Sequence, residues 1–139
     1  MTEHLRRLAT SVERNAATGR GIILVGAVGG NPVGLAKVHY FTPPEHSPGN
    51  VAPEGWYLSG VIVTPADRRR GIGRRLTAAR LDWIAERDTC AYYFVNARNL
   101  ASIDLHREFG FVEVTRDFAY PGASFEGGLG ILFRAEINR

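Results

Sequence analysis

The residues from Val61 to Leu76 most constrain what this chain folds into, because they join a strand, a basic turn and a helix start in one short stretch. The helix expected from Ile72 has unpaired N–H groups and a partial positive charge at its N-terminus. Gly71 and Gly73 carry no Cβ, so the phosphate of a ligand can approach the main chain closely. Arginines around the turn add charge-assisted hydrogen bonds. The stretch therefore predicts a cradle for a pyrophosphate group.

Other glycine motifs fit this turn poorly. A Walker loop requires Lys after its last glycine, and none follows here, whereas the dinucleotide fingerprint requires a third glycine where Leu76 stands. The clustered arginines are Arg68, Arg69, Arg70, Arg74 and Arg75. Because 16 of the 17 basic residues are Arg, the arginines alone are weak evidence, and the glycines carry more of the inference. A plain surface turn would leave this cluster without an anion, which is electrostatically unfavourable next to a helix N-terminus.

Hydrophobic periodicity and turn signals predict the remaining elements. The expected order is a helix over 2–18, strands over 21–28, 33–41 and 56–63, a helix over 72–88, a strand over 90–97, a helix over 101–109, and strands over 111–120 and 131–137. The first helix is expected from the spacing of Leu5, Leu8 and Val12, and the nearly continuous apolar strand 56–63 is expected to be covered on both faces. A proline-rich loop, 42–55, separates the second and third strands. This order indicates one α/β domain over residues 1–139, with a mixed sheet and helices on its faces.

Two motifs resemble the GNAT family of N-acetyltransferases. Arg68-Arg69-Arg70-Gly71-Ile72-Gly73 matches the family pattern Gln/Arg-x-x-Gly-x-Gly/Ala after a central strand. The stretch 95–111 then carries Asn, a short helix, an aromatic residue and Gly-Phe at the expected distance. The resemblance covers about residues 33–118. It implies an acyl-CoA N-acyltransferase fold, which is a mixed, mostly antiparallel, splayed sheet flanked by helices and is here short at the N-terminus.

The resemblance also implies a binding site for acetyl-CoA as co-substrate, wedged between the parted central strands. The implied cofactor-binding residues are Val61, Ile62, Val63, Arg68, Arg69, Arg70, Gly71, Ile72, Gly73, Arg74, Asn99 and Ser102. Typical members begin with a further strand and helix, whereas this chain is expected to start at the helix before the hairpin. A missing first strand would leave a sheet edge exposed, so a homodimer is expected to be possible.

The resemblance indicates the catalytic residues less directly than it indicates the cofactor-binding residues. Many family members place a Tyr in the second motif, where this chain has His106, whose imidazole could give a proton to the departing thiolate. An exposed or core-packed histidine is the alternative. Members with a Glu on the strand 90–97 use it as base, and Phe94 stands about there. Glu54 is therefore the first candidate base; the others are Glu45, His46, His39, Tyr57 or a chain of water molecules.

The expected activity is direct transfer of an acetyl group from acetyl-CoA to an amine of a small molecule or a peptide. A non-catalytic module that binds or senses acyl-CoA is the alternative, and a nucleic-acid patch is a poorer one because it gives the glycines no purpose. The net charge of +3 is too small to indicate nucleic acid. No apolar run approaches a membrane span and no secretory leader is expected, so we expect a cytoplasmic protein. With Cys90 as the only cysteine, no metal is expected.

Overall fold

The computed structural model describes residues 7–12, 21–68, 71–125 and 128–137. In these ranges the strands form one seven-stranded sheet in the order β1-β2-β3-β4-β5-β7-β6. The strands are β1 (Arg7–Val12), β2 (Gly21–Val28), β3 (Asn31–Phe41), β4 (Gly55–Val63), β5 (Cys90–Asn96), β6 (Val112–Thr115) and β7 (Gly130–Glu136). The helices are the short 3-10 turn η1 (Pro65–Asp67), α1 (Ile72–Ala85) and α2 (Leu100–Arg107). The mixed, mostly antiparallel sheet expected from the sequence is confirmed.

The predicted N-terminal helix is wrong over its described part. Residues 7–12 form β1, which pairs antiparallel with β2 from Arg7 opposite Ala27 to Val12 opposite Ile22. The apolar spacing fits a helix, but pairing here satisfies backbone groups along β2 that would otherwise form an open sheet edge. The remainder of the predicted helix lies outside the described residues. A first strand is therefore present, and the argument for a dimer from its absence no longer holds.

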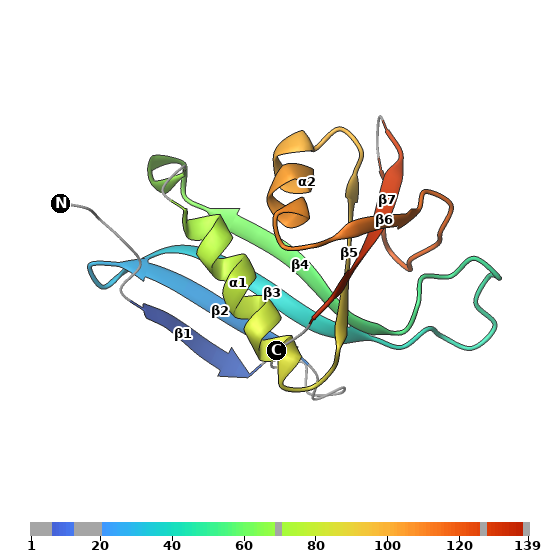
Figure 1. Cartoon of the computed structure of the whole chain (residues 1–139), viewed down its shortest axis with the longest axis horizontal. Helices are drawn as coiled ribbons and strands as arrows, with labels where there is room; N and C mark the ends of the chain where they lie inside the picture. The colour runs from blue at the N-terminus through green and yellow to red at the C-terminus, as the bar shows by residue number, and fades with distance from the viewer. Residues whose placement is uncertain (1–6, 13–20, 69–70, 126–127, 138–139) are drawn as a thin grey trace.

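Both helices lie on one face of the sheet, where α1 crosses β2, β3 and β4 and α2 stands beside β5 (Figure 1). The main core fills the space between α1 and the sheet, with Leu76 and Ile84 of the helix fully buried against Val38 of β3. An aromatic cluster covers the opposite face, built around Phe41, Tyr57 and Leu132. No helix within the described ranges is long and apolar enough to cross a membrane.

The two central strands part soon after they meet. Strands β4 and β5 run parallel and share a single register pair, Tyr57 opposite Tyr92. Beyond that pair β4 continues to Val63 and β5 to Asn96, so their carboxyl-terminal halves have no common ladder. The splayed sheet expected from the sequence is thus confirmed.

The prediction that the central strand is covered on both faces holds only for the first half of β4. Residues 55–58 are buried, whereas Ile62 is 61% exposed. A β-bulge accompanies this change, because the register against β3 shifts between Lys37 opposite Ser59 and Leu35 opposite Ile62. Gly60 lies inside the bulge with φ of 57°, a left-handed conformation that favours glycine. In the second half of β4, Ile62 is therefore exposed, whereas Val61 and Val63 stay partly buried against the main core.

Candidate functional site: a cleft between the parted strands

A cleft of about 870 Å³ occupies the gap between β4 and β5. Its walls are the second half of β4, the middle of β5, the first turn of α1 and the inner side of α2. The sequence-predicted site residues that line it are Val61, Ile62, Val63, Arg68, Gly71, Ile72, Gly73, Arg74, Asn99, Ser102 and His106. Arg69 and Arg70 lie outside the described residues. Residues far apart in the sequence, within 58–68 and 71–74 on one side and 93–106 on the other, are thus brought together around one cavity.

Gly71 forms the turn that enters α1 at one end of the cleft. It is the N-cap residue of the helix with φ of 78° and ψ of 11°, and no side-chain cap bonds the first N–H groups. A Cβ built at Gly71 would meet no protein atom within 4 Å, so the space above this turn is open. An uncapped helix start facing open space, with Arg68 and Arg74 beside it, fits a phosphate-bearing ligand.

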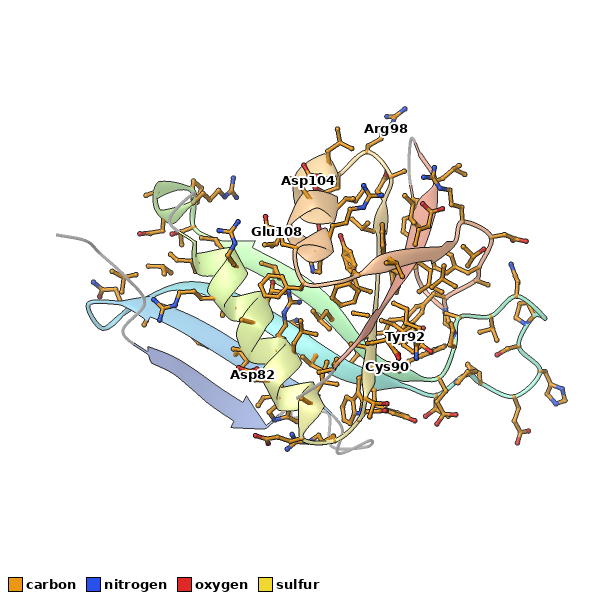
Figure 2. All side chains as sticks on the ribbon, viewed as in Figure 1. Asp82, Cys90, Tyr92, Arg98, Asp104 and Glu108 are labelled. Atoms are coloured by element: carbon orange, nitrogen blue, oxygen red, sulfur yellow. The ribbon has the colours of Figure 1, made fainter. Side chains whose placement is uncertain are left out.

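The two arginines at this turn have different partners. Arg68 Nε donates to the carbonyl of Val63 at 3.1 Å, which folds its side chain back onto the end of β4. Arg74 forms a bidentate pair with Glu108, with Nε–Oε1 2.9 Å and Nη2–Oε2 3.0 Å. Glu108 follows α2 and lies toward the start of α1 (Figure 2). The hydrogen bond from Arg74 lowers the pKa of the Glu108 carboxyl, and this exposed pair links the helices on the two sides of the cleft.

Asn99 and Ser102 have structural partners in α2 and β5. Asn99 is the N-cap residue, and its Oδ1 accepts from the Ser102 backbone N–H at 3.2 Å. The Ser102 hydroxyl hydrogen-bonds the Tyr93 hydroxyl at 2.5 Å. The amide of Asn99 thus holds the start of α2 against the cleft, which explains why an Asn is suited to this position.

His106 lies inside the molecule with 4% of its surface exposed. Its ring stacks on Tyr93 at a centroid distance of 3.7 Å and an angle of 9°, and Nδ1 donates to the Ser102 carbonyl at 2.8 Å. Because a carbonyl only accepts, Nδ1 carries the proton of the neutral ring. Burial lowers the pKa of His106 to about 4, so the ring is neutral at pH 7. Its role as a proton donor stays a prediction, and it needs a charged form that these surroundings disfavour.

Glu54 does not lie in this cleft. It precedes Gly55 at the start of β4, whereas the cleft is lined by residues toward the end of that strand. Its Oε2 accepts a hydrogen bond of 2.8 Å from the Tyr40 hydroxyl. His39 lies nearer to the cleft than Glu54 does, because its Nδ1 is 3.1 Å from Oγ of Ser59, a residue that lines the cleft. His39 Nε2 in turn hydrogen-bonds the Tyr120 hydroxyl at 2.5 Å. Burial raises the pKa of Tyr57, whose hydroxyl donates to the Pro53 carbonyl at 2.7 Å, so this phenol stays neutral.

The cleft passes through the sheet. Along β4 and β5 alternate side chains join opposite faces, so Leu58 and Tyr93 belong to the helix-side core and Tyr57 and Phe94 to the aromatic cluster. The cavity is lined by Leu58 and Tyr93 of the first set and by Phe94 of the second, so it is bordered by residues of both faces of the sheet.

Sequence analysis did not single out two polar residues of this site, Arg80 and Tyr93. Both line the cleft, Arg80 is 1% exposed and Tyr93 is 3% exposed. The spacing of Arg80 was a usable signal, because it stands four residues after Leu76 and four before Ile84, on the same buried stripe of α1. Among the described residues, no group of His, Cys, Asp and Glu is arranged to hold a metal ion.

Comparison with known proteins places this fold and cleft in a family. The sequence profile of the Acetyltransferase (GNAT) family matches residues 2–111, and the chain belongs to that family. No curated protein sequence matches the chain significantly.

Solved structures of similar fold include three relevant relatives. The ribosomal-protein-alanine N-acetyltransferase of Brucella melitensis is 29% identical, with 89% of this chain and 72% of that chain covered and a TM-score of 0.64. The ribosomal-protein-S18-alanine N-acetyltransferase of Escherichia coli is 19% identical, with 96% of each chain covered and a TM-score of 0.66. A Bacillus anthracis protein designated a streptothricin acetyltransferase, solved with acetyl coenzyme A, is 20% identical, with coverages of 86% and 64% and a TM-score of 0.65.

Proposed function

We propose that this protein transfers the acetyl group of acetyl-CoA directly to an amine of a small molecule or a peptide. The observation that carries the proposal is the cleft between β4 and β5, which starts at the uncapped helix turn of Gly71 and reaches the aromatic face at Ser59 and Phe94. Such a passage suits a donor and an acceptor that meet from opposite faces of the sheet. Direct transfer gains its rate largely from holding the two molecules together in this way.

The donor half of the site fits acetyl-CoA, whose thioester would supply the activated acetyl group. The N–H groups at the start of α1 would bind the pyrophosphate, with Arg68 and Arg74 beside them. The main-chain edge of β4 from Val61 to Val63 would hydrogen-bond the pantetheine arm, since this half of the strand has no ladder with β5, although the Val63 carbonyl already accepts from Arg68 Nε. The contacts from the start of α1 and from the edge of β4 would be made by main-chain groups, so they would depend on the fold more than on particular side chains.

The acceptor half would lie on the aromatic face. An amine must lose a proton as it attacks, and the hydrogen-bonded chain from Ser59 through His39 to Tyr120 leads from the cleft into this face. This chain favours His39, acting through the Ser59 hydroxyl, over Glu54 as the group that receives the proton. Aromatic rings around the same opening, Phe94 and Tyr120 among them, offer π faces to a cationic amine before it is deprotonated.

A panel of acceptors tests the proposal. The purified chain is incubated with acetyl-CoA and with small amines or peptides bearing free α-amino or lysine groups, and both released CoA and acetylated product are measured. Transfer to one acceptor class, absent in the Gly71→Glu variant, is the expected result. Acetyl-CoA binding without product from any acceptor would favour the alternative, a module that binds or senses acyl-CoA without transfer.

A further inference from the structure

Arg80 is a buried cation in the wall of the cleft. It lies in the third turn of α1, is 1% exposed, and donates from Nη2 to the Thr77 hydroxyl at 2.8 Å. Its Nε is buried without a hydrogen-bond partner. A guanidinium has five N–H donors, so these contacts leave its bonding capacity largely unused.

The surroundings of Arg80 provide no counter-charge. Among the described residues it forms no ion pair with a carboxylate. The titratable groups that face it from neighbouring elements are Tyr93 of β5 and His106 of α2, and both are neutral at pH 7. Burying an unpaired charge is unfavourable, and here it lowers the pKa of Arg80 to about 9, which still leaves the group charged at neutral pH.

The position of Arg80 separates it from the pyrophosphate turn. It stands seven residues after Gly73, which corresponds to roughly 10 Å along a helix that rises about 1.5 Å per residue. Arg80 therefore lines the cleft away from that turn, together with residues of both parted strands, where the sulfur end of a cofactor bound by its pyrophosphate at Gly71 would lie. The single carboxylate lining the described cleft, Asp67, lies in η1 near the pyrophosphate turn and hydrogen-bonds Thr64.

We infer that Arg80 stabilises the thiolate of CoA as it departs from the acetyl group. This inference rests on the proposed function. As the new C–N bond forms, the C–S bond breaks and its electron pair stays on sulfur, while the amine nitrogen gives up one proton to His39 through the Ser59 hydroxyl. The product sulfur thus gains a full negative charge in a cleft partly shielded from solvent, where a fixed buried cation stabilises it more than in water. Arg80 takes the part that a proton donor would otherwise have, which agrees with the neutral state of His106.

The thiol pKa of bound CoA tests this inference without any transfer reaction. The thiolate absorbs in the ultraviolet, and subtracting the spectrum of the free protein removes the contribution of Cys90. The titration runs from about pH 6 to about pH 9. Neither Tyr93, with a pKa raised to about 12, nor His106 changes charge in that window, and Arg80, with a pKa lowered to about 9, is charged over most of it. A thiol facing the guanidinium should have a pKa about one unit or more below that of free CoA.

Three variants test whether Arg80 causes the shift in the thiol pKa of bound CoA. In Arg80→Met the thiol pKa should return to the value of free CoA or rise above it, because burial alone raises a thiol pKa. Arg80→Lys should keep part of the shift. Arg116→Met removes an exposed arginine of the loop after β6, paired with Glu113 outside the cleft, and should keep all of it. An unshifted thiol pKa in the wild-type protein overturns the inference even if Arg80→Met does not fold.

Further outcomes separate the role of Arg80 from the proposed function and from an alternative role in binding an acyl carboxylate. A shifted thiol pKa without acetylation of any amine supports the role of Arg80 and contradicts the proposed function, whereas acetylation with an unshifted thiol does the opposite. Affinities for acetyl-CoA and for succinyl-CoA are compared in wild type and Arg80→Met. If the variant loses only succinyl-CoA affinity and the thiol pKa does not depend on Arg80, the cation binds an acyl carboxylate and the thiolate assignment is wrong.

Discussion

Substituting Gly71 by Ala separates the backbone requirement of the turn from its role toward a ligand. In the free protein the added Cβ would meet no atom within 4 Å, so the cost is conformational. A non-glycine residue in the left-handed region costs about 1–2 kcal/mol. Lower entropy of the unfolded chain offsets this cost by about 0.4–1 kcal/mol. The free energy of unfolding should therefore fall by about 1 kcal/mol, as measured by urea denaturation.

The loss in CoA affinity should be larger than this stability change suggests. The same Cβ would occupy the open space through which a pyrophosphate would approach the N–H groups of α1. Losing one charge-assisted hydrogen bond is worth about 1.5–3 kcal/mol, which corresponds to a fall in affinity on the order of 10- to 100-fold by calorimetry. Gly71→Glu, which adds a negative charge, should show no measurable binding.

Gly122→Ala is the matched control for this experiment. Gly122 has φ of 81° and open space around its Cβ position, but it does not line the cleft. Both variants should lose similar stability, and only Gly71→Ala should lose affinity for CoA. Equal and unchanged affinities in the two variants would refute the assignment of this turn as the pyrophosphate site.

Three other predictions follow from the site. Burial lowers the pKa of His106 from 6.5 to about 4, so the contribution of the neutral ring to the free energy of unfolding is complete above about pH 6.5 and declines toward pH 4, by up to about 3 kcal/mol. Urea titrations between about pH 4 and pH 7 should therefore show that the free energy of unfolding falls less steeply with acid in His106→Phe than in the wild-type protein. Equal slopes in the two proteins would contradict the buried neutral state. Asn99→Ala should lower the free energy of unfolding by about 1 kcal/mol through loss of the helix cap, whereas Asn99→Asp keeps the cap acceptor; reduced CoA affinity in both variants, with stability lost only in Asn99→Ala, would support the predicted cofactor contact of the amide. His39→Phe should lower kcat more than it raises KM, and Glu54→Gln should change both by less than about twofold; the reverse result would return Glu54 to the role of base.

The lining of the cleft around Gly71 could be predicted from the sequence because it depends on local features. A strand, a turn with Gly71 and Gly73, and a helix start are contiguous, and their backbone geometry follows from residue types close in the chain. The cap formed by Asn99 is equally local. Such features depend little on what packs around them, which is why the cleft lining contains these predicted residues.

The conformation of residues 7–12, the exposure in the second half of β4 and the place of Arg80 in the cleft depend on tertiary contacts, which the residue types alone do not indicate. Residues 7–12 fit a helical spacing, but the free edge of β2 decided their conformation. The second half of β4 has the composition of a covered strand, yet its exposure follows from the separation of β5. Arg80 was overlooked because arginine is so frequent in this chain that one more carried little information, although its place on the buried stripe of α1 marked it.

The single register pair between β4 and β5 also has a consequence for the stability of the protein. The sheet consists of two leaves, one with β1 to β4 and one with β5 to β7, and past Tyr57 and Tyr92 no strand hydrogen bonds join them. A ligand that bonds both walls would complete this seam. Unfolding should then depend on ligand concentration, with a gain of about 2.7 kcal/mol at 100 times the dissociation constant. The melting temperature of the chain would therefore report the CoA concentration around it, and the protein would be least protected from proteolysis when CoA is scarce.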